Sequence, residues 1–296
     1  MKDYVIYTVL TGDYDNITQP LVIDDRFDYI LFTDNVSQPK IGVWEVRPIT
    51  IHHSNHRTRS RYPKCLPSVV LSEYSSSLYM DANFQIIDDW IYKRYIECYQ
   101  GKVEWASVKH PCRNNLYQEI CDLLDLQWVH DYDTIEWYAK MKKDGYNAGN
   151  GLLENGIIFR MHTKHTEEAG LLWWDTLQQY CSRDQFSLMC VLWKTNIHPT
   201  FLFSQEECPR LKSVHIKYYN HNPHTRVVKL SINELLRKKC ISVAPWKELS
   251  YKYLFDKLSR YKHPRIMLYM WEIYAIFAYG YKVIMRIVKR KLNLNE

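Results

Sequence analysis

RYPKCLPSVVLSEYSSSLYMDANFQI, residues 61–86, is the stretch of this sequence that decides its fold. Two basic side chains, Arg61 and Lys64, come first, and an apolar strand near the end is followed by Asp81 and Asn83. Open α/β sheets bind ligands beyond the carboxyl ends of their strands. Two residues spaced by two at a strand end can face the same side, so both side chains can reach one ligand. The stretch therefore predicts an α/β fold with a polar site after this strand.

Three other segments have strand character. Residues 4–10 and 28–35 are rich in β-branched and aromatic side chains, and the turn sequence TGDYDN follows the first of them. A third segment, LLENGIIFRMHT, places Asn155 and Gly156 before another apolar run, which we predict to be a buried strand. A strand that ends in a polar, glycine-containing loop is where open α/β sheets bind nucleotides.

Residues 52–64, HHSNHRTRSRYPK, form a basic segment in front of a predicted helix at residues 66–74. We predict a loop and leave two interpretations open: a solvated loop, or a loop that faces phosphate and leads into that helix. The sequence H-H-x-x-H lacks the glutamate beside the first histidine that zinc metalloproteases need, so a zinc hydrolase is disfavoured.

Helical segments are also predicted at residues 114–125 and 133–143. Further along, WWDTLQQYCSRDQFSLMCVLW is predicted to contain two helical turns, a loop and a new helix. That helix opens with Asp184 and Gln185 and is predicted to be capped by Ser182. No period of 20 to 50 residues repeats, which excludes solenoids and propellers.

The charge is unevenly distributed along the chain. The 296 residues carry a formal net charge of +6 with an ordinary globular composition. Residues 231–296 contain 14 Lys+Arg and 5 Asp+Glu, a balance of +9, whereas residues 1–230 sum to −3. We predict one domain at residues 1–230 and a helical C-terminal region at residues 231–296. The faintly acidic domain disfavours nucleic acid as a partner, because that partner calls for a basic groove.

The C-terminal region is aromatic as well as basic. Residues 266–281, IMLYMWEIYAIFAYGY, are fewer than the roughly 20 that a spanning helix requires, and they include Glu272. The basic residues that follow are Lys282, Arg286, Lys289, Arg290 and Lys291. Aromatic rings and cations suit the headgroup region of a bilayer, so we expect the tail to bind an anionic membrane surface. A solvated helical face is the alternative.

The cysteines and the start of the chain indicate a compartment. Eight cysteines are scattered without a C-x-x-C pair, which argues against a metal cluster. The first residues contain no apolar stretch long enough for a signal peptide. We expect reduced thiols in a cytoplasmic protein, peripheral to the inner face of the cell membrane.

Five motifs, in this order, resemble glycosyltransferases of the GT-A type: YTVLTGDYDN, ILFTDN, the stretch of residues 61–86, ENGIIFRMHT and SRDQFSL. The nearest resemblance is to a domain family of plant mucilage- and pectin-related proteins, proposed to transfer galacturonic acid, and their bacterial relatives. The chain also resembles, more distantly, the retaining galactosyl- and glucosyltransferases of family eight. The resemblance implies a Rossmann-like α/β domain with a mixed central sheet that binds a nucleotide-sugar.

The resemblance also implies which residues bind the donor, expected to be a UDP-sugar. The implied donor-binding residues are Thr8, Gly12, Asp34, Arg61, Lys64, Asp81 and Asn155. The first three would hold the nucleoside, and the two basic residues would contact the diphosphate or the donor sugar. The asparagine would hold sugar hydroxyls.

A divalent cation, Mn²⁺ or Mg²⁺, is the implied cofactor. Asp81 and Asn83 stand where the family-eight relatives have the metal-binding D-x-D motif. An amide oxygen can ligate such an ion, but affinity falls when a carboxylate is lost, so metal dependence stays open. The relatives often supply a late histidine as a third ligand. Here His215, His221 and His224 are available, and we favour His221.

Asp184 and Gln185 are implied to lie beneath the anomeric carbon. In an inverting enzyme the carboxylate would deprotonate the acceptor hydroxyl. In a retaining enzyme the pair would stabilise an oxocarbenium-like centre while the acceptor attacks from the leaving-group face. A neutral glutamine beside the aspartate, together with the family-eight resemblance, favours retention.

These expectations combine into one function and one alternative. We expect a glycosyltransferase that acts at the cytoplasmic face of the membrane on a surface-glycan acceptor, such as a lipid-linked glycan of capsule or lipopolysaccharide synthesis. The alternative is a non-catalytic, membrane-associated glycan-binding or scaffold protein of GT-A shape, which would bind glycan without consuming a donor.

Overall fold

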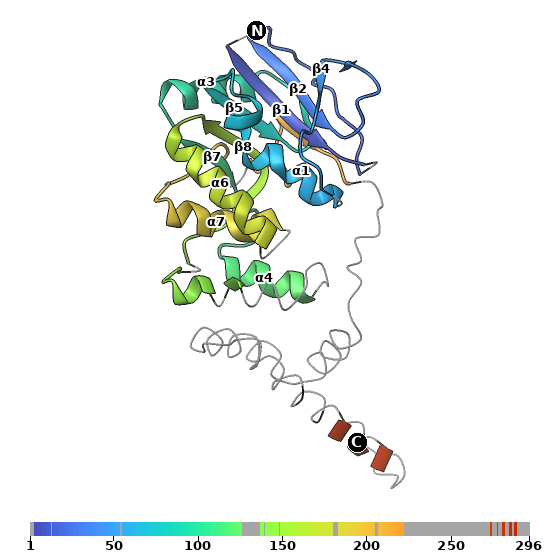
Figure 1. The fold of residues 1–296 in the computed structure, drawn as a ribbon, viewed down its shortest axis with the longest axis vertical. Helices are drawn as coiled ribbons and strands as arrows, with labels where there is room; N and C mark the ends of the chain where they lie inside the picture. The colour runs from blue at the N-terminus through green and yellow to red at the C-terminus, as the bar shows by residue number, and fades with distance from the viewer. Residues whose placement is uncertain are drawn as a thin grey trace. The chain divides into compact units, whose positions relative to one another are not determined.

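A computed structural model describes residues 3–221 except 13, 54, 126–136, 139, 148, 180–182, 205 and 206, together with eight positions between residues 273 and 288. The strands and helices are β1 (Tyr4–Leu10), β2 (Phe27–Thr33), β3 (Lys40–Ile41), β4 (Trp44–Pro48), α1 (His56–Cys65), α2 (Pro67–Val70), β5 (Ser76–Met80), β6 (Phe84–Ile86), α3 (Trp90–Gln100), β7 (Trp105–Lys109), α4 (Leu116–Asp125), β8 (Leu153–Met161), α6 (Lys164–Gln179), α7 (Asp184–Lys194), β9 (Thr200–Phe201) and β10 (Ile216–Tyr218) (Figure 1).

The chain divides into two compact units. The first contains residues 1–116 and 148–225, and the second contains residues 117–147 and 226–296. Every strand named above and every residue predicted for the site lies in the first unit. The boundary that the sequence predicts at residue 230 lies outside the described residues.

The first unit is built on a mixed eight-stranded sheet with the strand order β3-β4-β2-β1-β5-β8-β7-β9. Strand β1 is parallel to β2 on one side and to β5 on the other, while β8 runs antiparallel to β5 and β7. The chain passes from β1 to β2 and returns to the opposite side of β1 as β5. Such a reversal of strand order creates a crevice at the carboxyl ends, where α/β proteins bind ligands. The predicted α/β class with a mixed central sheet is confirmed.

Successive side chains of the central strands point to opposite faces of the sheet and so pack in different layers. Ile6 and Leu78 join the apolar core that also contains residues of α3, such as Tyr95. Tyr7, next to Ile6, points the other way, and its hydroxyl donates to the carbonyl oxygen of Pro63 in α1 over 3.3 Å. Figure 1 shows α1, α6 and α7 gathered on the same side of the sheet. The helix α1 therefore lies over the carboxyl-terminal crevice.

The basic segment at residues 52–64 is not the predicted loop, because most of it forms α1. Asn55 caps the helix: its side-chain oxygen accepts hydrogen bonds from the backbone N–H groups of Arg57 and Thr58. Pro63 lies inside the helix, where it removes one backbone donor. Packing of the last turn against the sheet outweighs this loss, and the residues from Pro63 onward are buried.

Other boundaries differ from those predicted. Asn155 and Gly156 lie inside β8 and not before it, and the pairing of β8 with β7 shifts register beside them. Strand β5 ends at Met80, as predicted, and residues 81–83 form a turn before β6. The N-cap of α7 is Arg183, without a side-chain hydrogen bond, and the predicted cap Ser182 lies outside the described residues. Among the helices that the structure describes, none is both long and apolar enough to cross a membrane.

Candidate active site

Lys64 lies at the centre of a buried cluster of charged side chains. Its Nζ is 2.7 Å from Asp184 Oδ2 and 3.7 Å from Asp81 Oδ1, and only 2% of its side chain is exposed. Arg61, on the same face of α1 three residues earlier, reaches the other oxygen of Asp184 at 3.3 Å. The structure thus brings together four residues predicted for the site, two from α1, one that follows β5 and one at the start of α7.

The carboxylate of Asp184 is held in its ionised form. Burial would raise its pKa, but the charges of Arg61 and Lys64 outweigh burial and hold the pKa well below its ordinary value. The backbone is fixed as well, because Trp173 Nε1 donates to the carbonyl oxygen of Asp184 over 3.2 Å. An aspartate in the first turn of a helix is also favoured by the helix dipole. Asp184 is therefore a fixed anion that can stabilise a positive centre.

Arg160 of β8 holds the end of α1, and with it Lys64, in place. This buried guanidinium donates to the carbonyl oxygen of Lys64 over 2.5 Å and to that of Cys65 over 3.2 Å. A cation is favourable at these last carbonyls of a helix. Helix α6 approaches the same point at Gly170, where a Cβ atom would lie 2.5 Å from the carbonyl oxygen of Cys65. The sheet and α6 together determine where α1 ends.

Asp81 is fixed where β5 meets β8. Its backbone N–H donates to the carbonyl oxygen of Gly156 over 2.8 Å, and the Tyr79 hydroxyl donates to its Oδ1 over 2.5 Å. Burial and the charge of Asp81 raise the pKa of Tyr79 well above its ordinary value, so this hydroxyl remains a donor. The Asp81 side chain is 22% exposed, which leaves it accessible to a ligand.

Two residues that the sequence analysis did not identify belong to the same cluster. Glu154 of β8 is buried and accepts a hydrogen bond from the backbone N–H of Gly156 over 3.0 Å. Nη2 of Arg210 lies 2.8 Å from its Oε1. Burial raises the pKa of Glu154, although Arg210 opposes this effect. The available signal was a glutamate inside an apolar run, and for Arg210 no sequence signal was present.

The residues predicted to hold a nucleoside lie at the carboxyl ends of β1 and β2. Gly12 has a φ of +59°, and its backbone N–H donates to Asp34 Oδ1 over 3.0 Å. His56 and Arg59 of α1 contact the other oxygen of Asp34 at 2.8 and 3.1 Å. Partial burial opposes ionisation, but the hydrogen bonds from Gly12 and His56 lower the pKa of Asp34. Asp34 therefore joins the loop after β1 to the start of α1.

Several buried polar atoms of the residues predicted to bind the donor or a metal have no hydrogen-bond partner among the described residues. They are Thr8 Oγ1, Asn83 Oδ1, and both Oδ1 and Nδ2 of Asn155. Buried polar atoms are normally satisfied, so such a group of atoms at one edge of a sheet suits a polar ligand. Gln185 lies at the same edge, and its Nε2 donates to the carbonyl oxygen of Leu153 over 3.3 Å.

The three residues expected to ligate a metal do not form a common ligand set. Asp81 faces Lys64, as described above. Asn83 and His221 are neighbours, with Asn83 Nδ2 3.4 Å from His221 Nδ1, but Asn83 Nδ2 also donates to the carbonyl oxygen of Tyr219, and His221 Nδ1 lies 2.7 Å from Asp15 Oδ2. Among the described residues, no group of three or more His, Cys, Asp or Glu side chains is arranged to hold a metal. Mg²⁺ at a nucleotide site is usually held by one or two carboxylates together with waters and phosphate oxygens. Asp81 is the one carboxylate of the three expected ligands and already pairs with Lys64, so these residues fit such an ion poorly.

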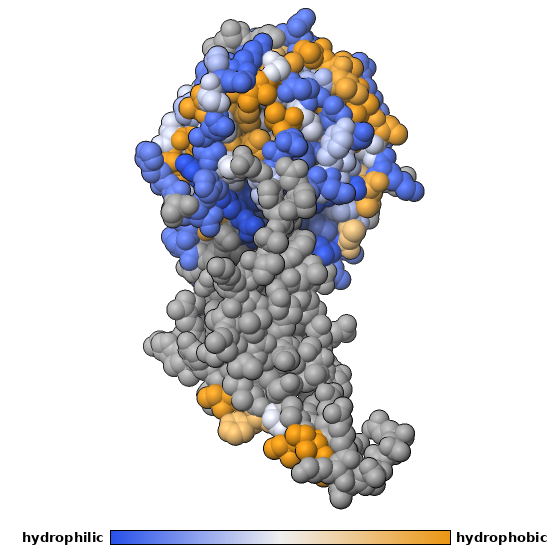
Figure 2. Space-filling view, turned by 90° about the vertical axis from the view of Figure 1, so that its right-hand side faces the viewer, coloured by the Kyte–Doolittle hydropathy of each residue, from blue (hydrophilic) through white to orange (hydrophobic). Residues whose placement is uncertain are grey.

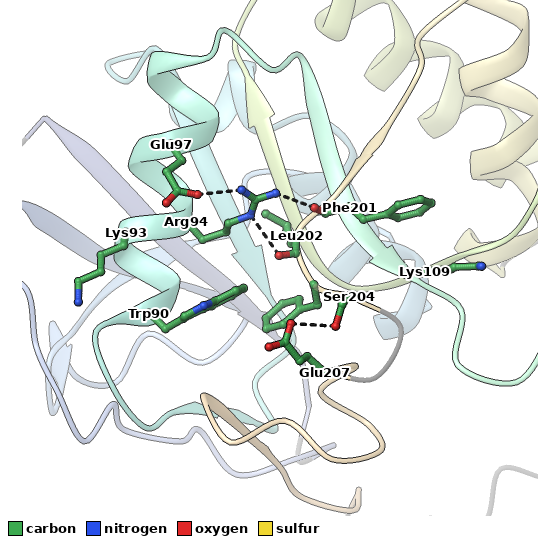
Figure 3. A pocket seen from close by; sticks show the side chains of 10 residues that line it. Trp90, Lys93, Arg94, Glu97, Lys109, Phe201, Leu202, Ser204 and Glu207 are labelled. Atoms are coloured by element: carbon green, nitrogen blue, oxygen red, sulfur yellow. Dashed lines mark hydrogen bonds and ion pairs between the residues drawn. The ribbon is translucent and has the colours of Figure 1, made fainter.

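A separate cavity of about 630 Å³ lies beside α3 (Figure 3). Arg94 extends along one side of it and donates to the carbonyl oxygens of Phe201 and Leu202 over 2.9 and 3.1 Å. Trp90 stacks on Phe203 with ring centroids 4.6 Å apart. None of the residues predicted for the site lines this cavity, so it is distinct from the predicted donor site.

The chain was compared with known proteins and solved structures. No curated protein matches the chain. The chain is similar to the solved apo structure of the bifunctional glycosyltransferase WbbM, with 11% identity, a TM-score of 0.44 and coverage of 85% of this chain. It spans about half, 51%, of the WbbM chain. It is also similar to the galactosyltransferase LgtC in complex with donor and acceptor sugar analogues, with 11% identity, a TM-score of 0.39 and coverage of 74% of this chain and 87% of that one.

The family assignment comes from the sequence. A family model described as TOD1/MUCI70, glycosyltransferase-like domain, matches residues 4–219, which is most of the chain and includes all the site residues named above except His221. The chain belongs to the TOD1/MUCI70 glycosyltransferase-like family.

Proposed function

We propose that the protein is a glycosyltransferase that moves a sugar from a UDP-sugar to a glycan acceptor with retention of the anomeric configuration. The observation that supports it most is the Asp184 carboxylate, held ionised between Arg61 and Lys64 at the carboxyl-terminal edge of the sheet. Sugar transfer needs cations where charge develops on the leaving diphosphate and an anion near the positive anomeric centre. This cluster supplies both.

The unpartnered polar atoms support a donor that runs along the same edge. Thr8, Gly12 and Asp34 lie at the ends of β1 and β2, where the nucleoside is proposed to bind. The diphosphate then reaches Arg61 and Lys64, and the sugar lies near the unpartnered amide of Asn155 and near Gln185. We infer this order from the positions of the residues along the edge.

The electrostatics of Asp184 favour retention over inversion. A general base works best when its pKa lies near the operating pH. The two cations hold the pKa of Asp184 far below that range, so its carboxylate is a poor proton acceptor. It is well suited to face an oxocarbenium-like carbon. In the proposed step, the bond between the anomeric carbon and the diphosphate oxygen breaks, and the acceptor oxygen forms its bond on the same face. The acceptor proton passes to the released diphosphate oxygen.

The proposal is tested by incubating the purified protein with a panel of UDP-sugars and glycan acceptors. Transfer is detected by mass spectrometry, and proton NMR of the fresh product gives its anomeric configuration. Failure to consume any donor, combined with no binding of UDP by calorimetry, would refute the proposal. A glycan-binding scaffold would instead bind acceptor without consuming donor and would be indifferent to Asp81→Ala. An inverted product would refute the retaining mechanism alone.

We further propose that the enzyme works at the inner face of the cell membrane, on lipid-linked acceptors of capsule or lipopolysaccharide synthesis. Support comes from the described residues of the C-terminal region, most of which are drawn in orange near the bottom of Figure 2. Exposed apolar side chains recur there at intervals of three or four residues, at Ile273, Phe277, Tyr281, Ile284 and Val288. That spacing gives a helix one apolar face. The five basic residues from Lys282 to Lys291 would complement anionic headgroups.

Vesicle sedimentation tests the membrane proposal. We expect the full chain to bind vesicles that contain phosphatidylglycerol and not vesicles of phosphatidylcholine alone. The double variant Phe277→Glu, Ile284→Glu should lose this binding, because two charges would enter the apolar face. The matched control is Leu21→Glu with Val36→Glu, which changes two apolar side chains of the first unit that are also more than half exposed. Equal binding by both double variants would contradict the proposal.

A further inference from the structure

The ammonium group of Lys64 lies between the carboxylates of Asp81 and Asp184. Its Nζ is 2.7 Å from Asp184 and 3.7 Å from Asp81, the residue that was expected to ligate a metal. A divalent cation bound to Asp81 beside a diphosphate would need the space and the negative charge that this ammonium already uses. The position of Lys64 is fixed by the fold: 98% of its side chain is buried, and Arg160 donates a hydrogen bond to its backbone carbonyl oxygen.

The charges of the cluster are balanced without a metal ion. Its cations are Arg61, Lys64 and Arg210, and its acids are Asp81, Asp184 and Glu154, each linked to at least one of those cations by an ion pair. Three positive and three negative side chains leave no surplus of negative charge. Each of these acids already pairs with a cation, and the amide of Asn83 is neutral, so the cluster offers a divalent cation no carboxylate that is not already paired with a basic side chain.

His221, the remaining expected ligand, lies 3.4 Å from Asn83 Nδ2 but makes its shorter contact with a different acid. His221 lies 2.7 Å from Asp15, and its ring packs against that of Tyr14 with centroids 5.3 Å apart. Both partners belong to the turn after β1. His221 therefore connects the segment that follows β10 to this turn, and this contact gives the histidine a structural role.

On the basis of the proposed function, we propose that Lys64 and Arg61 stabilise the diphosphate of the donor in place of a divalent cation, so that donor binding and transfer need no metal. Both side chains are anchored by Asp184, which orients their remaining N–H donors. When a diphosphate enters, these charge-assisted donors can be shared between Asp184 and the phosphate oxygens. Arg61 is the more exposed of the two, with 23% of its side chain accessible, and would be reached first.

Calorimetry of UDP and UMP binding to the full chain tests the inference. Titrations are run in EDTA and in MnCl₂, with Lys64→Met as the variant and Lys93→Met as the matched control. Lys93 is also paired with an aspartate, at 2.6 Å from Asp89, but 64% of its side chain is exposed. For the wild-type chain, we expect the dissociation constant of UDP to differ by less than about twofold between the two buffers, because no ion contributes to binding.

The variants identify the group that replaces the ion. Lys64→Met should weaken UDP binding by about tenfold or more, because a charge-assisted contact is lost, and should change UMP binding by less than about threefold. Lys93→Met should change neither. A thermal melt establishes that Lys64→Met is folded, and if it is not, the comparison of the two buffers on the wild-type chain decides by itself.

The possible failures are distinguishable. UDP binding that occurs only with Mn²⁺, or that Mn²⁺ strengthens by about tenfold or more, would overturn the inference and leave the proposed function intact. Unchanged UDP binding by a folded Lys64→Met variant would overturn the role of Lys64. Absence of UDP and UMP binding in both buffers would overturn the proposed function, and the inference with it.

Discussion

Replacing Asp184 with asparagine removes one negative charge from the buried cluster while keeping the shape of the side chain. Of its two ion pairs, Lys64 would then keep only the longer one of 3.7 Å to Asp81, and Arg61 would lose its 3.3 Å ion pair. Breaking a buried ion pair by removing one partner costs about 3–5 kcal/mol. Because Asp81 still compensates part of the charge of Lys64, we expect the lower end of this range, about 3 kcal/mol.

Urea unfolding followed by tryptophan fluorescence measures this cost. The matched control is Asp89→Asn, which breaks the pair with Lys93 at the surface, where side-chain exposures are 57% and 64%. Exposed i,i+4 pairs contribute about 0.3–0.5 kcal/mol, so the control should unfold almost as the wild-type chain does. If the two variants lost the same free energy of unfolding, the assignment of Asp184 to a coupled buried cluster would be wrong.

The same variant separates a structural role from a catalytic one. Below its unfolding transition, Asp184→Asn should lose turnover by about 10²-fold or more, the usual effect of removing one preorganised electrostatic group. UDP binding should change much less, because the asparagine does not remove a phosphate donor. Full turnover in the folded variant would refute the placement of Asp184 at the anomeric centre.

Three further predictions follow from single contacts. Thr8→Val removes a buried hydroxyl without a described partner, so stability should be unchanged or slightly higher, while UDP binding measured by calorimetry should weaken. Gly170→Ala places a Cβ atom 2.5 Å from the carbonyl oxygen of Cys65 and should cost about 1–3 kcal/mol in urea unfolding despite the better helix propensity of alanine. Burial, with the charge of Arg160, lowers the pKa of His162 to about 4. Between about pH 6.5 and 4, the imidazole is therefore protonated in the unfolded chain and neutral in the folded chain. Stability should therefore be complete above about pH 6.5 and fall as the pH drops toward 4, and His162→Gln should remove this dependence.

The fold was predictable where one local pattern dominates. The strands at residues 4–10 and 28–35 were predicted because β-branched and aromatic residues are concentrated there, and the structure has β1 at Tyr4–Leu10 and β2 at Phe27–Thr33. The start of α7 at Asp184 was also predicted correctly. In each case, local preference and burial favour the same structure, so the sequence alone is informative.

The errors arose where tertiary contacts outweigh local preference. Pro63 and four nearby basic residues indicated a loop, but the hydrogen bonds to the carbonyls of Pro63, Lys64 and Cys65 from the sheet stabilise a helix end there. Asn155 and Gly156 have the sequence of a turn, yet they lie in a strand at a shift in register. Sequence patterns do not reveal contacts between residues that are distant along the chain.

The candidate site was predictable in its members and not in their pairing. The motifs selected Arg61, Lys64, Asp81 and Asp184 separately, with the acids assigned to a metal and an anomeric centre and the cations to phosphate. Only the structure shows that one ammonium group joins both acids. Glu154 and Arg210, which balance the cluster from the other side, could not be paired from sequence because they belong to different segments without a shared motif.

This pairing couples the stability of the site to its proposed chemistry. The cluster draws on α1, the ends of β5 and β8, α7 and the loop that carries Arg210, so it can form only when all of these elements are assembled. Each isolated charge would be costly to bury, whereas the complete set is compensated. A donor diphosphate adds negative charge to this balanced set. The accessible side of Arg61 and the fixed ammonium of Lys64 are the groups that can stabilise that charge. Binding of the donor should therefore stabilise the assembled cluster through Arg61 and Lys64 of α1, and UDP should raise the unfolding temperature of the wild-type chain far more than that of Lys64→Met, which is expected to bind UDP weakly.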